Sequence, residues 1–310
     1  MKKAILLTLA AAFILFGAGT LASAEDASIV STSMSMSIRV ENVYNAFGVQ
    51  ISGIETTTTS TTTSNSLNET SSTTTIQTVY SEWRGGSVKV DKIEGTSDTK
   101  ASDDSYSHTT FSVDYDYESG TGKLSSASGG SSTNGSYGTD ANGEAIGTYN
   151  TNTTETYTIK NGQALRTQSS TTGASYGPDG TKKADIKQSA TYGYSLAGGS
   201  WQLTAETTVS ENIGVDGSSE KITRSKTYSR DKNGVLGGVS QTASGTKVVI
   251  TSAGASKTLT MHDYSAEFEF GDAGWYLKKE SYTWEEGAAD EGTADEGTAD
   301  EGDAAAEAEG

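Results

Sequence analysis

The spacing of its turn signals constrains the fold of this chain more than any other feature. Eleven short turn signals follow one another at intervals of 17 to 22 residues between Gly85-Gly86 and Gly271-Asp272. Five of them are Asn-Gly or Asp-Gly dipeptides, which begin at Asn142, Asn161, Asp179, Asp216 and Asn233. Such dipeptides favour the tight hairpin turn in which both central residues take positive φ. The regular spacing therefore predicts a series of consecutive β-hairpins.

The segments between the turns alternate between apolar and polar residues. From Trp201 to Val215 the odd positions carry most of the apolar residues and the even positions are polar or glycine. His262, Tyr264, Ala266, Phe268 and Phe270 also share one parity. The same pattern occurs at residues 184–196, 111–117 and 149–159. Period-two alternation indicates strands with one buried and one solvated side.

These patterns predict an all-β fold, because no window of residues 25–284 carries a convincing helical stripe. We expect a single domain with about twelve strands from Leu67 to Trp284 and one or two before Asn65. The threonine-rich run Thr56–Ser64 fits an exposed strand or a flexible loop, and the high β propensity of threonine favours the strand. Short connections imply a long antiparallel up-and-down meander of about 12–14 strands. Such a sheet must protect its edges, so we expect it to be closed or strongly curved, as a barrel or flattened barrel.

The first residues predict export. Lys2 and Lys3 precede the apolar run Ala4–Phe16, and Ala22-Ser23-Ala24 is a small-residue cleavage site. We therefore interpret residues 1–24 as a signal peptide of bacterial type. The apolar run is shorter than the ~20 residues of a membrane-spanning helix. The chain has no cysteine, so disulfides and a lipid-modified cysteine are excluded.

The last residues form an acidic low-complexity segment. Residues 285–310 contain eleven acidic residues and no basic one, and we expect them to be a disordered tail. The net charge of the chain is −18, to which the signal peptide adds +2 and the tail −11, so residues 25–284 carry −9. This modest acidity argues against charge-driven binding of nucleic acid or anionic membranes.

The residues predict neither an enzyme nor a cofactor or metal site. Gly173–Gly177 matches the G-x-S-x-G pattern of a nucleophile elbow, but a predicted hairpin turn follows where the elbow needs a helix. Only two histidines occur, and we expect His108 to be exposed and His262 to lie on the face of Tyr264. Asp114, Asp116 and Glu118 alternate on one strand face, but the calcium-loop pattern fails at the glycine and closing glutamate positions.

Three uses of such a sheet fit the sequence. The first is an exported, non-enzymatic envelope or extracellular protein that holds a hydrophobic small molecule against a tyrosine-rich inner face. The alternatives are an outer-membrane β-barrel and a surface or filament-forming subunit that contacts other envelope components. Charged residues on apolar faces disfavour contact with lipid, because Arg224, Lys226 and Arg230 share parity with Ile222 and Tyr228. The candidate ligand-facing aromatic residues are Trp201, Tyr192, Tyr194, Tyr264 and Phe268.

Overall fold

The computed structural model describes residues 29–46, 49–65, 69–83, 87–140, 142–252, 254–271 and 274–286. These residues form a single antiparallel sheet in which each strand pairs with its neighbours in sequence, from β1 to β14. The strands are β1 Ile29–Tyr44, β2 Gln50–Asn65, β3 Glu69–Trp83, β4 Ser87–Ala101, β5 Tyr106–Tyr117, β6 Leu124–Ser136, β7 Thr148–Lys160, β8 Gln163–Tyr176, β9 Lys182–Ala197, β10 Ser200–Gly214, β11 Ser219–Arg230, β12 Leu236–Ile250, β13 Ser256–Gly271 and β14 Gly274–Glu286. The predicted all-β meander is confirmed, and Thr56–Ser64 lies within β2.

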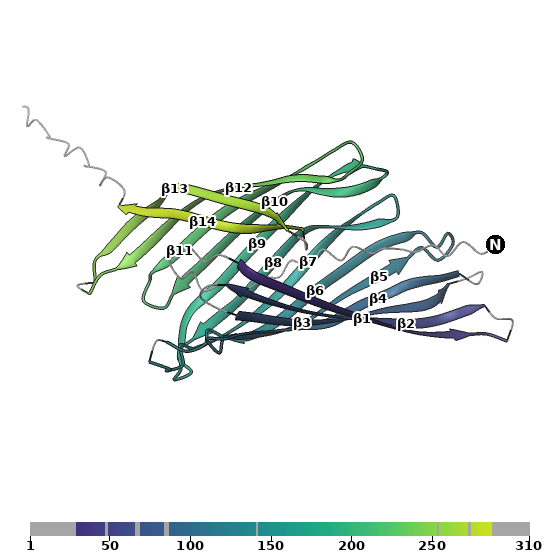
Figure 1. Ribbon diagram of the computed structural model, residues 1–310, viewed down its shortest axis with the longest axis horizontal. Coiled ribbons are helices and arrows are strands. Elements are labelled where there is room, and N and C mark those ends of the chain that lie inside the picture. The colour runs from purple at the N-terminus through teal and green to yellow at the C-terminus, as the bar shows by residue number, and fades with distance from the viewer. Residues whose placement is uncertain are drawn as a thin grey trace, which may run out of the picture.

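The sheet is twisted and curved along its length, so that the first and last strands lie in front of the central ones in Figure 1. β1 and β14 are the two ends of the strand order and do not pair with each other in the described residues. The predicted signal peptide, residues 1–24, lies outside the described residues. The predicted tail does so from residue 287 onward, whereas Glu285 and Glu286 belong to β14 and pair with β13.

The turns lie where the dipeptides predicted them, but most have another geometry. At Asn161-Gly162 both residues have positive φ, 51° and 77°, as a two-residue hairpin turn of this type requires. At the other four dipeptides only the glycine has positive φ. There the glycine N–H donates to the residue three positions earlier, as Gly217 does to Gly214. This is the longer hairpin loop with a single left-handed glycine, so the prediction of two positive φ values was wrong at these four turns.

Two β-bulges change which residues share a face. In β10 the register shifts between Leu203 and Ala205, so Thr204 is an extra residue. In β13 it shifts between His262 and Ser265, at Asp263, whose φ is 53°. Because side chains alternate with period two, one extra residue reverses the face of all that follow. The predictions that odd positions share one face throughout β10, and that His262 shares the face of Tyr264, were therefore wrong.

The register defines two faces. The tyrosine face carries Tyr115, Tyr149, Tyr157, Tyr192, Tyr228, Tyr264 and Tyr282, whereas the hydroxyl face carries rows of serine, threonine and asparagine such as Asn150, Asn152, Thr154 and Thr156. Along β7 the two faces alternate strictly between half-buried or buried and exposed residues. Ala190, Tyr192 and Ile222 lie on the tyrosine face and are among the most buried residues, with 1%, 7% and 2% exposure. Most of the buried apolar residues therefore lie on this face, whereas Leu165 and Ala174 are buried on the hydroxyl face.

Glycines opposite aromatic residues allow close packing on the tyrosine face. Gly95 pairs with Phe111, and a Cβ at Gly95 would lie 2.6 Å from the Phe111 ring. Gly135 pairs with Tyr149 and is covered by its ring in the same way. An aromatic ring laid over a cross-strand glycine covers backbone that the glycine leaves bare. The many glycines of this chain thus have two uses, in turns and beneath aromatic rings.

Candidate binding face

The tyrosine face also carries charged side chains, and several of these are paired with one another. In the cluster at β7 and β8, Glu155 Oε1 accepts a hydrogen bond from Arg166 Nη1, and Glu155 Oε2 accepts one of 2.6 Å from the Tyr157 hydroxyl. The Arg166 guanidinium lies 4.4 Å from the centre of the Tyr192 ring. The Tyr194 hydroxyl donates to the Arg166 carbonyl oxygen over 2.9 Å. The ion pair is largely buried, with side-chain exposures of 21% for Arg166 and 14% for Glu155.

A second cluster joins strands β11 to β14. Glu280 Oε1 accepts hydrogen bonds from Arg224 Nε over 3.0 Å and from the Tyr264 hydroxyl over 2.9 Å. Gln241 on β12 donates to the Tyr264 hydroxyl. Arg224 and Glu280 belong to strands three steps apart, which a flat sheet would hold about 14 Å from each other. The contact between them indicates that the sheet curves toward the tyrosine face.

Two further groups of contacts involve charged residues of this face. Glu206 is only 8% exposed, accepts a hydrogen bond of 3.1 Å from the Tyr228 hydroxyl and stands opposite Lys226 in the register. Lys247 lies 3.2 Å from Glu220, and its Nζ is 6.0 Å from the centre of the Trp284 ring. Each buried carboxylate therefore has a donor, as burial of a charge requires.

Burial on this face changes the acidity of its tyrosines. Burial raises the pKa of the Tyr115, Tyr192 and Tyr194 hydroxyls above the usual value of 10.0. The pKa of Tyr264 rises to about 12, mainly because the hydroxyl is buried, although the hydrogen bond from Gln241 lowers it and Glu280 raises it. The hydroxyls therefore stay protonated at neutral pH and act as donors to the carboxylates.

The predicted ligand-facing aromatic residues fall into two groups that the structure does not bring together. Tyr192 and Tyr194 lie on β9, and Trp201 lies on the adjoining β10 on the same face by register. Tyr264 and Phe268 lie on β13, with β11 and β12 between them and β10. Tyr192 is buried at 7% exposure, so its ring supports Arg166 and offers little surface to a ligand. Tyr194, Tyr264 and Phe268 are half-buried and present ring surface.

Trp201 occupies a separate environment at the start of β10. Lys160 Nζ lies 4.5 Å from the centre of its ring, and its backbone N–H donates to Gln163 Oε1 over 3.3 Å. Its indole Nε1 is buried and has no hydrogen-bond acceptor in the described part of the chain. An indole N–H without an acceptor is unusual in a buried site.

Several charged residues of the face were not among the predicted site residues. The parity of Arg224 with Ile222 and Tyr228 was visible in the sequence, and its acceptor Glu280 lies 56 residues away. Glu155 shares the parity of Tyr149 and Tyr157, which was a usable signal. The position of Glu206 on the tyrosine face could not be predicted from the sequence, because it results from the bulge at Thr204.

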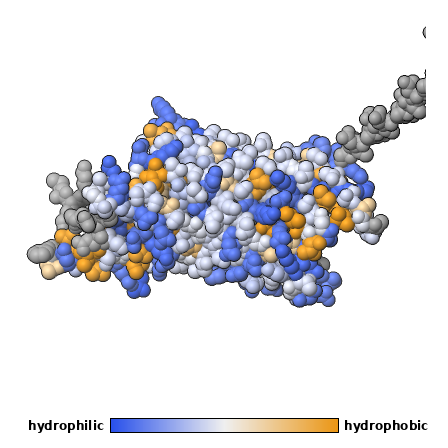
Figure 2. Space-filling view, turned by 180° about the vertical axis from the view of Figure 1, so that it is seen from behind, coloured by the Kyte–Doolittle hydropathy of each residue, from blue (hydrophilic) through white to orange (hydrophobic). Residues whose placement is uncertain are grey.

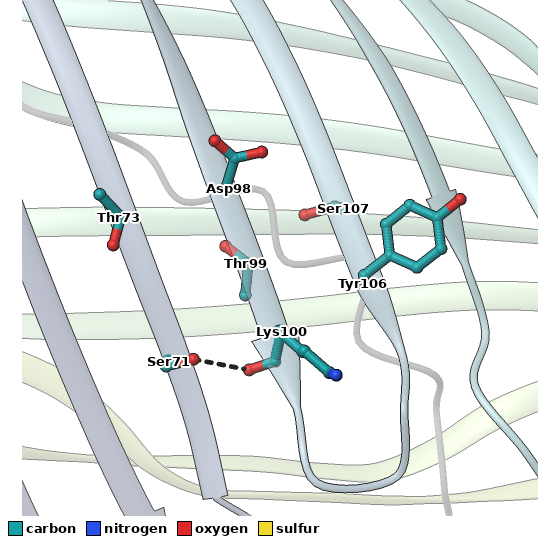
Figure 3. Close-up of a pocket in the computed structure, with 7 residues that line it drawn as sticks. All are labelled: Ser71, Thr73, Asp98, Thr99, Lys100, Tyr106 and Ser107. Atoms are coloured by element: carbon teal, nitrogen blue, oxygen red, sulfur yellow. Dashed lines mark hydrogen bonds between the residues drawn. The ribbon is translucent and has the colours of Figure 1, made fainter.

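The opposite face is polar and holds a shallow hollow. Figure 2 shows the molecule from behind, with mostly hydrophilic or neutral residues and hydrophobic ones gathered toward the two ends. A hollow of about 270 Å³ lies over β3, β4 and β5, lined by Ser71, Thr73, Asp98, Thr99, Lys100, Tyr106 and Ser107 (Figure 3). Asp98 pairs with His108 over 2.6 Å, and Lys100 Nζ lies 3.7 Å from Asp104. These charges are matched within the protein. Other strands cross behind the hollow in Figure 3.

Within the described ranges, no three or more histidine, aspartate or glutamate side chains gather closely enough to hold a metal ion. The described residues also include no helix with the length and apolarity of a membrane span. The fold and the tyrosine face together define the class of protein. It is an all-β chain with one long antiparallel meander, whose tyrosine face carries paired charges. Comparison with protein-family models, curated proteins and solved structures found no match.

Proposed function

We propose that this chain is an exported, non-enzymatic envelope or extracellular protein that binds a hydrophobic small molecule with a polar group along its tyrosine face. The observation that carries the proposal is the composition of this face. Its carboxylates and basic groups neutralise one another, as in Arg224 and Glu280, while the rings of Tyr264 and Phe268 keep accessible surface. Neutralised charge and aromatic surface favour an apolar ligand over an ionic one.

The curvature of the sheet supports this role. The contact between Arg224 and Glu280 requires the sheet to bend toward the tyrosine face, and the first and last strands lie in front of the central ones in Figure 1. We propose that the sheet is barrel-like in solution, in the sense of a strongly curved or flattened barrel. Such a shape would partly enclose a ligand on the concave tyrosine face without forming a closed cavity.

The distribution of charge supports an aqueous location over the alternative of an outer-membrane barrel. Charged side chains lie on both faces, with Glu155 and Arg166 on the tyrosine face and Lys92 and Asp114 opposite each other on the hydroxyl face. A charge that faces lipid near the bilayer midplane costs about 2–4 kcal/mol, so neither face suits lipid. We propose the periplasm, the cell surface or the medium as the location. Fractionation of the producing cell tests this, and extraction that requires detergent would contradict it.

Mass spectrometry of an organic extract tests the ligand directly. Protein purified without detergent from the producing cell should release a hydrophobic molecule in a stoichiometric amount. For the stripped protein, the uncharged fluorophore N-phenylnaphthylamine serves as an apolar probe of the same face. Phe268→Ala should weaken probe binding several-fold, whereas Val209→Ala, on the hydroxyl face, should leave it unchanged. An empty extract together with equal probe binding by both variants would overturn the proposal.

A further inference from the structure

The strand at the N-terminal end of the sheet order, β1, has one edge without a neighbouring strand among the described residues. Its side chains alternate along the strand. Met34, Met36, Ile38 and Val40 lie on the tyrosine face and are 55–62% exposed, while Ser33, Ser35 and Ser37 lie on the other face. An edge with free backbone donors and acceptors and an exposed apolar row is a template for another strand.

The two ends of the sheet differ in how they resist such pairing. β14 carries Lys278, Lys279, Glu280, Glu285 and Glu286, and charges on an edge strand oppose strand addition. β1 has no charge or proline from Ile29 to Ile38, and its only charged residues are Arg39 and Glu41. The edge at β1 is therefore the less protected of the two against addition of a further strand. Residues 287–310 contain only Ala, Gly, Thr, Asp and Glu, so they offer no large apolar side chain to match this apolar row.

We infer that the edge of β1 pairs with β1 of a second copy of this chain, antiparallel and centred on Val40. The charges select this register. Arg39 and Glu41 lie two residues apart on one face, form an ion pair with each other and are 79% and 56% exposed. A pair centred on Val40 puts each Arg39 opposite the Glu41 of the other copy, which adds two ion pairs between the copies to the pair within each copy. Moving the centre of the pair to residue 39 would put Arg39 opposite Arg39, and moving it to residue 41 would put Glu41 opposite Glu41.

The same register suits the apolar row. Residues directly opposite each other in an antiparallel pair point to the same face. Val40 would face Val40 of the other copy, with Ile38 of each copy at the diagonal position, and Met36 would face Tyr44. The exposed side chains of both copies would thus cover one another. The tyrosine faces of the two copies would lie on the same side of a continuous sheet. This inference is independent of what the tyrosine face binds.

The absence of cysteine from the chain allows a direct test. Val40 would lie on the two-fold axis, where opposite Cα atoms are about 4.5–5.5 Å apart, a separation that a disulfide spans. Val40→Cys should therefore give a covalent dimer on mild oxidation. Val43→Cys is the matched control, because Val43 is 53% exposed on the same strand but would lie far from its counterpart. Equal cross-linking of the two variants, or none by Val40→Cys, would overturn the register.

Charge exchange tests the ion pairs separately. Arg39→Glu alone and Glu41→Arg alone should each weaken dimerisation about tenfold, because like charges would then face each other. The double variant should restore the dimer. Sedimentation velocity over a range of concentrations measures the change, and circular dichroism checks that each variant is folded. A wild-type chain that stays monomeric, forms open-ended polymers or responds to none of these changes would contradict the proposal.

Discussion

At the scale of the residue, tyrosine hydroxyls hold the charged groups of the inner face. Tyr157 donates to Glu155, Tyr228 to Glu206 and Tyr264 to Glu280. A carboxylate that accepts hydrogen bonds from both a basic group and a phenol has its hydrogen-bonding capacity satisfied without water. The rings meanwhile supply apolar area beside the charges. This combination explains why one face can be both charged and buried.

Replacement of Arg166 should destabilise the protein more than replacement of a surface lysine. Arg166→Met leaves the largely buried Glu155 without its basic partner, and we expect the free energy of unfolding to fall by about 2–3 kcal/mol. The double variant Arg166→Met, Glu155→Gln should recover much of this loss. Lys182→Met, in an exposed pair with Asp185, should cost under about 0.5 kcal/mol. Urea denaturation measures the wild type, these three variants and Glu155→Gln alone, and strict additivity of the Arg166 and Glu155 single changes would contradict the coupling.

Stability should fall in alkaline solution through the tyrosines. Burial raises the pKa of Tyr264 to about 12, whereas the unfolded side chain titrates near 10. Between these values the unfolded chain has released a proton that the folded chain keeps, so the free energy of unfolding decreases as the pH rises from about 10 to 12. Tyr264→Phe should reduce this pH dependence. Urea denaturation between pH 8 and about 11.5 measures it, and an unchanged slope in the variant would contradict this assignment.

At the scale of the element, glycines and bulges decide how each strand meets its neighbours. Gly135 lies beneath the Tyr149 ring, and the Thr204 bulge brings Glu206 onto the tyrosine face. Thr204 Oγ1 donates to the Gly193 carbonyl over 3.2 Å, at the bulge itself. Both features are local, yet the bulge sets the face of every residue that follows it in β10.

Gly135→Ala should be destabilising. The added Cβ would meet the Tyr149 ring and lie 2.5 Å from the Tyr106 carbonyl oxygen, so the ring or the backbone must move. Overpacking of this kind costs about 1–3 kcal/mol. Gly120→Ala is the matched control, because nothing lies within 4 Å of its Cβ and its φ is not in the left-handed region. Thermal unfolding compares the two variants, and similar midpoints would show that Tyr149 accommodates the methyl group freely.

At the scale of the whole molecule, contacts run almost entirely between sequence neighbours. Each strand from β2 to β13 pairs with the strand before it and the strand after it, and the buried apolar residues lie between β7 and β13. A sheet held together by contacts between neighbouring strands unfolds locally from its edge strands, as repeat proteins do from their terminal repeats. The edges and the centre should therefore differ in stability.

Hydrogen exchange should show this gradient. We expect the slowest amide exchange in β8, β9 and β10 and the fastest in β1 in dilute protein. Mass spectrometry of peptic fragments measures the protection of each strand. Increased protection of β1 at high protein concentration would follow from the proposed dimer. Uniform protection of all strands in dilute protein would instead indicate a closed barrel and contradict the gradient.

The amino-acid sequence by itself determined the all-β class, the number of strands and the places of the turns. These depend on local properties, namely period-two alternation and the φ preferences of residues such as Asn161 and Gly162. Only the tertiary structure decided which residues share the inner face, which charges meet and which edges stay open. One extra residue at Thr204 or Asp263 reverses a face, and only the register against the neighbouring strand reveals it. Likewise, Arg224 and Glu280 meet because the sheet curves, which no local pattern encodes.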